Sequence, residues 1–101
     1  MLIFNTTFHA EMEESKNLII YLQEKYIPEA QKSGVMRNAR MSRIISNQED
    51  GTESFCVQFE VEEMAQLHKW YTSEGTKLNN EMSKLYNKKV ISFPTVMEVM
   101  E

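Results

Sequence analysis

The sequence predicts a single α+β domain with elements in the order strand, helix, strand, strand, helix, strand. Three observations lead to this fold class. Apolar residues alternate with a period of two near both ends and in the middle of the chain, which is typical of half-buried strands. Helical spacing of apolar residues fills the two intervals between these runs. The length of 101 residues suits one hydrophobic core, so residues 1–101 are expected to form one domain.

Composition and charge exclude several classes of protein. The chain is 42% hydrophobic and 26% charged, as in ordinary globular proteins, and its net charge of -4 opposes binding to nucleic acid. Its one cysteine, Cys56, permits neither an intramolecular disulfide nor a thiolate zinc site. No segment resembles a signal peptide or a membrane span. We therefore expect a cytoplasmic protein with no nucleic-acid partner, no membrane partner and no metal.

The first strand and the first helix adjoin near Glu11. In the run LIFNTTFH, residues 2–9, the side chains of Leu2, Phe4 and Phe8 share one parity, which predicts a strand. From Glu11 onward, helical spacing replaces alternation. The stripe that this helix is expected to present consists of Met12, Ser15, Ile19, Leu22 and Tyr26, with Leu18 beside it.

Pro28 and Gly34 define the end of the first helical stretch. Proline lacks a backbone N–H and disfavours the helical conformation at the residue before it. The main helix is therefore expected to end or kink near Tyr26. The run PEAQKS then predicts a short second helical segment, and Gly34 predicts a left-handed turn into the next strand.

Two strands joined by a hairpin are predicted in the middle of the chain. VMRNARMSRIIS, residues 35–46, is interpreted as the first strand because its end is β-branched and a turn follows, although arginine recurs at every third residue. Asn47, Asp50 and Gly51 supply the turn. ESFCVQFEVE then alternates cleanly. Its apolar face consists of Phe55, Val57, Phe59 and Val61, and its other face of Ser54, Cys56, Gln58 and Glu60.

A second helical stretch and a final strand complete the pattern. The apolar stripe of this helix consists of Met64, Leu67, His68, Tyr71, Leu78, Met82 and Leu85. Gly75 falls on the same stripe and predicts a break or a close approach to the sheet. In VISFPTVMEVM, Ile91, Phe93, Met97 and Val99 share one parity. Pro94 cannot donate to a strand ladder, which predicts an edge strand or a bulge.

This order of elements is the split βαβ, or ferredoxin-like, arrangement βαββαβ with a four-stranded antiparallel sheet. The helices are expected to cover one face of the sheet. The other face would expose apolar side chains from strand one (Leu2 or Ile3), from strand two (Met41 or Ile44) and from both parities of the last strand. Two sheets packed face to face would cover these side chains. The sequence therefore predicts a homodimer.

The stretches YIPEAQKSGVMRNARMSRII, FCVQFEV and VISFPTVMEVM together resemble a bacterial family of about a hundred residues that is known as a domain of unknown function. The resemblance covers essentially the whole chain. That family is in turn similar to the dimeric α+β barrel superfamily, which includes the antibiotic-biosynthesis monooxygenases. The resemblance implies a dimeric α+β barrel and does not imply one activity, because this architecture serves many functions.

The resemblance also directs attention to Asn5 and Trp70. Haem-degrading members of the superfamily combine an asparagine, a tryptophan and a histidine, but there the histidine follows the tryptophan by some helical turns. Here His68 precedes Trp70 by two residues, so the two rings point in different directions. The spacing therefore argues against a haem site, and no cofactor is predicted.

A pocket between the helices and the sheet is the remaining candidate site. Its candidate lining residues are His68, Tyr71, Trp70, Tyr26 and Asn5. Because His68 lies on the apolar stripe, it is expected to be partly buried with a backbone partner rather than catalytic. The favoured function is a binding or interaction module for a small apolar ligand. The alternative is a cofactor-independent monooxygenase or isomerase, in which a histidine or tyrosine moves a proton.

Overall fold

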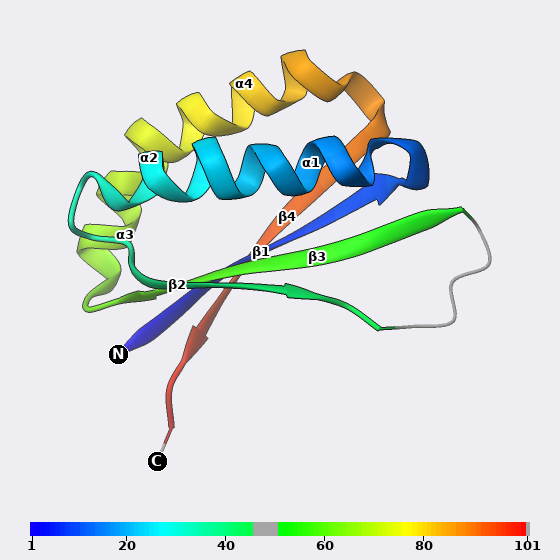
Figure 1. The fold of residues 1–101 in the computed structure, drawn as a ribbon. Coiled ribbons are helices and arrows are strands. Elements are labelled where there is room, and N and C mark those ends of the chain that lie inside the picture. The colour runs from blue at the N-terminus through cyan, green and yellow to red at the C-terminus, as the bar shows by residue number, and fades with distance from the viewer. Residues whose placement is uncertain (46–50, 101) are drawn as a thin grey trace.

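A computed structural model describes residues 1–45 and 51–100 of the chain. Two helical stretches lie on the same face of a four-stranded sheet (Figure 1). The elements are β1 (Leu2–Glu11), η1 (Met12–Glu14), α1 (Ser15–Tyr21), η2 (Leu22–Tyr26), α2 (Ile27–Gln31), β2 (Arg37–Arg43), β3 (Thr52–Val61), α3 (Met64–Trp70), η3 (Tyr71–Gly75), α4 (Thr76–Tyr86), η4 (Asn87–Lys89) and β4 (Val90–Glu98). This order confirms the predicted βαββαβ arrangement. The hairpin residues Asn47 and Asp50 fall outside the described residues.

The sheet has the strand order β2-β3-β1-β4, and every neighbouring pair is antiparallel. The two long strands β1 and β3 form its centre, with Phe4 opposite Phe59 and Phe8 opposite Phe55. β4 is an edge strand, as Pro94 predicts, and its register with β1 runs through Pro94 without a bulge. The bulge lies instead in β2, between Arg37 and Arg40.

The hydrophobic core fills the space between the sheet and the helices. Its buried side chains come from alternate positions of β1 and β3 and from one stripe of each helical stretch, as the periodicities predict. They are Phe4, Phe8, Ala10, Leu18, Leu22, Tyr26, Ala30, Met36, Phe55, Val57, Phe59, Val61, Leu67, Trp70, Leu78 and Met82. Met64 and Leu85, predicted on the second stripe, are exposed instead because they lie in the first turn of α3 and the last turn of α4.

The first helical stretch passes through Pro28 without ending. Residues 22–26 form a π-helical turn, and the Ile27 N–H bonds to the Leu22 carbonyl five residues earlier. Tyr26 and Ile27 both keep helical dihedral angles. The helical stretch therefore does not end near Tyr26, while the predicted short second segment is present as α2, with Pro28 in its first turn. The wider turn precedes Pro28 directly, where a regular helix would have lost a hydrogen bond. Gly34 has a φ of 77° and begins the turn toward β2, as predicted.

The second helical stretch also contains a π-helical turn, at residues 71–75. Gly75 sits at its end with helical dihedral angles, so the stretch is not broken there. The close approach at Gly75 is not to the sheet. A Cβ atom at this position would lie 2.9 Å from Cζ3 of Trp70. Gly75 therefore makes room for the buried indole ring one turn earlier on the same helix.

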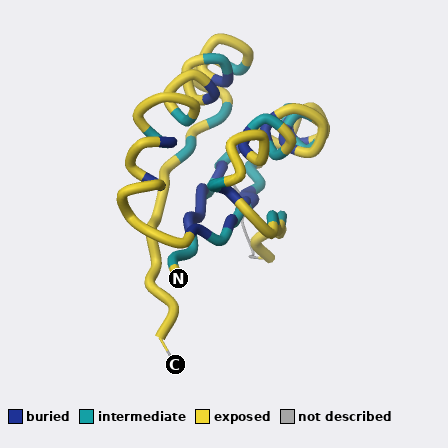
Figure 2. Tube along the Cα trace, turned by 90° about the vertical axis from the view of Figure 1, so that its left-hand side faces the viewer, coloured by how far each residue is buried: buried dark blue, intermediate teal, exposed yellow. Residues whose placement is uncertain are grey.

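The outer face of the sheet, turned away from the helices, is covered by no other part of the described chain (Figure 1). The strand β4 is exposed along nearly its whole length (Figure 2). Its outward side chains include Ile91 and Phe93, which retain 61% and 54% of their surface. They pair with His9 and Thr7 of β1, and the side chains of these two residues point to the same outer face of the sheet. The predicted apolar outer face is thus concentrated on one edge of the sheet.

Candidate functional site

An open apolar groove of about 520 Å³ lies between α3 and the edge of the sheet. The residues that line it are Phe4, Met64, Ala65, Leu67, His68, Tyr71, Pro94 and Val96. Phe4 comes from β1, and Pro94 and Val96 come from the helix-facing side of β4. The groove exists because α3 and α4 leave this side of β4 partly uncovered, with Val96 still 42% exposed.

A small cavity of about 20 Å³ adjoins the groove on its inner side. It is lined by Phe4, Thr6, Tyr26, Trp70, Tyr71, Gly75, Asn79, Ser92 and Pro94. Three of these residues, Phe4, Tyr71 and Pro94, also line the groove. The cavity therefore lies directly behind the groove wall.

Both π-helical turns supply residues to this cavity. Tyr26 ends the turn of the first stretch, and Tyr71 and Gly75 begin and end the turn of the second. A π-helical turn inserts one residue into a helix, at some cost in hydrogen-bond geometry, and such turns are frequent at functional sites. Their coincidence around one cavity marks it as the best candidate site in the described part of the chain.

Aromatic rings hold the walls of the site in place. Phe4 meets Trp70 and Tyr71 edge to face, with ring centroids 6.0 Å and 5.9 Å away. Contacts of this geometry contribute about 0.5–1.5 kcal/mol each beyond burial of surface. Trp70 is 3% exposed, and its indole N–H has no hydrogen-bond partner among the described residues.

Burial shifts the titration of Tyr26. Its ring packs between Phe8 and Phe59, and the loss of solvent raises the pKa of the Tyr26 hydroxyl above its ordinary value. An interaction with the Thr6 hydroxyl acts in the opposite direction and is smaller. Tyr26 is therefore neutral at physiological pH. It presents the cavity with a hydroxyl group and not with a charge.

His68 and Tyr71 both line the groove, so the structure brings these two candidates together. His68 is exposed, and its ring has no hydrogen-bond partner in the described chain, contrary to the expected buried histidine. The reason is helical geometry, because Leu67 takes the buried position and His68 follows it about 100° around the helix. Trp70 and Tyr26 line the inner cavity.

Asn5 lies on the opposite face of the sheet from the other four candidates. It follows Phe4 in β1 and therefore points outward, where its side chain is buried and donates to Thr7 at 3.2 Å. The asparagine, tryptophan and histidine thus do not meet around one cavity. On the same outer face, Thr7 lies 3.7 Å from the sulfur of Cys56, and Nδ1 of His9 lies 2.8 Å from the Ser54 hydroxyl. His9 is partly buried there.

Sequence reasoning did not identify Phe4, Pro94 and Val96 as walls of the site. Phe4 was expected in the core, and the side of the sheet that Pro94 and Val96 face follows only from the register of β4 with β1. Within the described residues, no three potential metal ligands gather in one place. In the same part of the chain, no helix is both long and apolar enough to cross a bilayer.

The sequence matches a known family over nearly its full length. The profile of the domain of unknown function DUF4286 covers residues 1–100. The chain belongs to the DUF4286 family. No curated protein sequence matches it significantly. The resemblance seen in the sequence is thereby confirmed at the level of the family.

Solved structures confirm the fold of this DUF4286 chain. A Deinococcus radiodurans protein, provisionally assigned as an antibiotic biosynthesis monooxygenase, superposes with a TM-score of 0.71 at 20% identity, over 100% of this chain and 94% of that one. HapK from Hahella chejuensis superposes with a TM-score of 0.71 at 6% identity, over 99% of this chain and 93% of that one. A dimeric ferredoxin-like protein from an uncultured marine organism superposes with a TM-score of 0.60 at 16% identity, over 99% of this chain and 96% of that one. At such identities the similarity establishes the fold and leaves activity open.

Proposed function

We propose that this DUF4286 protein is a homodimeric binding module that takes a small apolar molecule into the groove between α3 and β4. One observation carries the proposal: the groove of about 520 Å³ is walled mainly by apolar side chains and adjoins a buried aromatic cavity. Volumes of roughly 300–1,000 Å³ with few polar groups are typical of small-molecule sites. Transfer of an apolar ligand from water to such walls is favourable.

The groove is tested by filling it from the helix side. Ala65 is exposed and lines the groove, whereas its neighbour Gln66 is exposed and does not. Ala65→Trp is expected to abolish binding of the amphipathic probe 1-anilinonaphthalene-8-sulfonate, whose aromatic rings would enter the groove, while Gln66→Trp, the matched control, leaves binding within about twofold. Isothermal titration calorimetry measures both. Equal binding by both variants would place the probe elsewhere and contradict the proposal.

The proposed dimer forms through the outer face of the sheet. This face carries Ile91, Phe93, Met97 and Val99 from the edge strand, all of them exposed. A contiguous apolar edge on one uncovered sheet face is a typical self-association surface. The ferredoxin-like protein of similar fold from an uncultured marine organism is dimeric, which supports self-association of this fold.

Replacement of Phe93 by lysine tests the dimer. Full burial of a phenylalanine contributes about 1.5–3 kcal/mol. Since 54% of Phe93 is exposed, its burial in a dimer contributes roughly 1 kcal/mol per subunit. Phe93→Lys is therefore expected to weaken dimerisation at least about thirtyfold, because two copies are lost and two charges are introduced. Leu85→Lys, at a residue 59% exposed on α4, is the control. Light scattering across a concentration series that shows both variants equally dimeric would refute the interface.

A second candidate function, a cofactor-independent monooxygenase or isomerase, is favoured by one observation. His68 and Tyr71 are three residues apart on one helical face, and both line the groove. A histidine and a tyrosine placed this way can move a proton on a bound substrate. The open groove weighs against it, because an open site does not exclude water from a reactive intermediate.

Native mass spectrometry of gently purified protein separates these possibilities. A dimer with additional mass gives the identity of the retained molecule. Incubation of that molecule with the wild type and with His68→Ala and Tyr71→Phe variants then decides between binding and turnover. Consumption by the wild type alone indicates the enzyme, while equal retention by all three proteins indicates the binding module.

A further inference from the structure

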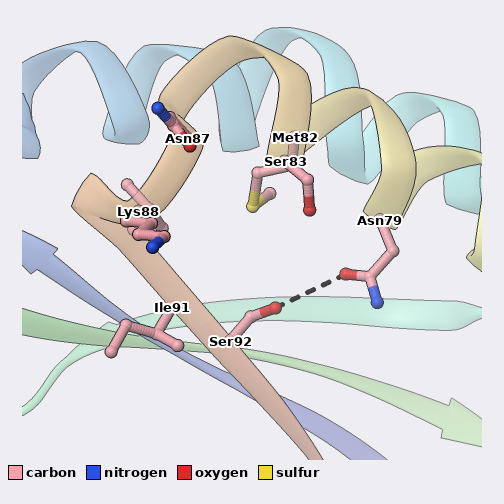
Figure 3. Close-up of a pocket in the computed structure, with 8 residues that line it drawn as sticks. Asn79, Met82, Ser83, Asn87, Lys88, Ile91 and Ser92 are labelled. Carbon is pink, nitrogen blue, oxygen red and sulfur yellow. Dashed lines mark hydrogen bonds between the residues drawn. The ribbon is translucent and has the colours of Figure 1, made fainter.

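A second cleft, more polar than the first, lies at the other end of the same helix–strand boundary. It has a volume of about 480 Å³ between α4, η4 and the start of β4. The residues that line it are Asn79, Met82, Ser83, Asn87, Lys88, Val90, Ile91 and Ser92. Figure 3 shows Asn79, Met82 and Ser83 on the helix above the strand, with Lys88 near the turn that leads into β4.

The inner cavity lies between the two clefts. It shares Phe4, Tyr71 and Pro94 with the apolar groove and shares Asn79 and Ser92 with the polar cleft. The three spaces therefore follow one another along the helix-facing side of β4. A molecule that lay along β4 across Pro94 would have its apolar end beside α3 and its polar end beside η4.

The polar cleft is equipped to receive a hydrogen-bond acceptor with negative charge. Among the described residues that line it, none is acidic, and Lys88 supplies a positive charge. Lys88 has no ion pair or hydrogen bond within the described chain, whereas its neighbour Lys89 lies 3.6 Å and 3.7 Å from Glu13 and Glu14. Asn79 accepts a hydrogen bond from Ser92 at 3.4 Å, which leaves its amide N–H groups as donors.

Asn87 adds a further sign that this cleft is built for a ligand. Its backbone has φ 53° and ψ -126°, a conformation that favours glycine. Asparagine at such a position costs stability, and strained residues of this kind cluster at ligand sites. Asn87 is one of the residues that line the polar cleft, so it has a side chain available there that glycine would lack.

We infer that the polar cleft is the head-group end of the ligand site and that the ligand is an elongated amphipathic anion with a carboxylate-type head and an apolar body. This inference rests on the proposed binding function of the apolar groove. Lys88 pairs with the head, Asn79 and Asn87 donate hydrogen bonds to it, and the body lies past Pro94 toward Val96.

Decanoate and decanol form the test pair, because they share an apolar chain and differ in head-group charge. Binding is measured by calorimetry and by the fluorescence of Trp70, the one tryptophan in the sequence. The wild type is expected to bind decanoate about tenfold more tightly than decanol. Lys88→Met should remove this preference. The control Lys77→Met, which makes the same charge change on α4 outside the cleft, should preserve it.

The outcomes distinguish the two proposals. Equal affinity for decanoate and decanol in the wild type, unchanged by Lys88→Met, overturns the head-group site while leaving the apolar groove intact. An equal loss of preference in Lys77→Met also overturns it, because the effect would then come from net charge. Failure of the wild type to bind either molecule overturns the apolar groove itself. Melting temperatures of all variants show whether each remains folded.

Discussion

The contact between Gly75 and Trp70 makes the sharpest prediction about the candidate site. An alanine Cβ at position 75 would lie 2.9 Å from Cζ3 of the indole, closer than real Cβ atoms come to another atom, and 3.3 Å from Cε3, which is also a tight contact. Gly75→Ala gains about 1 kcal/mol of helix propensity. Forcing an extra methyl group into a packed site costs about 1–3 kcal/mol. Because Trp70 is 3% exposed and has little freedom to move, we expect a net loss of about 1 kcal/mol.

A double-mutant cycle isolates this contact. Trp70→Leu removes the six-membered ring that meets position 75, so Gly75→Ala in that background should recover the helix propensity and stabilise the protein by about 1 kcal/mol. Urea unfolding followed by circular dichroism measures all four proteins. In the wild-type background the melting temperature should fall by about 4–8 °C.

Two results would refute this reasoning. The first is stabilisation of the wild type by Gly75→Ala, which would mean that the indole ring yields without cost. The second is an equal effect of Gly75→Ala in both backgrounds, which would mean that position 75 and the indole ring are not coupled. Either result would remove the physical reason given for glycine at this point in the helix.

Three further predictions concern the rest of the chain. Burial raises the pKa of Tyr26 above its ordinary value of 10.0. The stability that neutral Tyr26 contributes is therefore complete below about pH 10 and is lost as pH rises through the pKa of the folded state. Tyr26→Phe should make the free energy of unfolding fall less steeply between pH 9 and 11 in urea titrations. Gly34→Ala, at φ 77°, should destabilise by about 1 kcal/mol in the same assay, and an unchanged midpoint would contradict the assigned turn. Asn87→Gly should stabilise by about 1 kcal/mol and weaken decanoate binding, and a lower melting temperature would show that Asn87 is not strained.

Much of the fold follows from periodicity that a single sequence displays. Alternation in β3 correctly separates the core residues Phe55, Val57 and Phe59 from the outward Cys56. Alternation in β1 likewise places Asn5 and Phe4 on opposite faces of the sheet. This placement is enough to exclude a pocket that Asn5 and Trp70 share. These properties are local, because the direction of a side chain depends on its position in its own strand or helix.

The candidate site depends on distances between elements that are far apart in the sequence. Residues of β1 and β4 meet those of α3 only after the sheet has formed, and the groove exists because α3 and α4 leave Pro94 and Val96 partly uncovered. The sequence pattern also does not reveal the π-helical turns that end at Tyr26 and Gly75. A helix with one inserted residue has nearly the same spacing of apolar residues as a helix that is interrupted at that point.

The sequence by itself determined the order of the strands and helices, the inward face of each central element and the membership in a family. The tertiary structure alone decided that His68 is exposed, that Trp70 is buried over Gly75 and that two clefts flank one small cavity along β4. The physical reason is the range of the interactions. Backbone hydrogen bonds and periodic burial act over a few residues, whereas the shape of a cleft is set by how whole elements pack against one another.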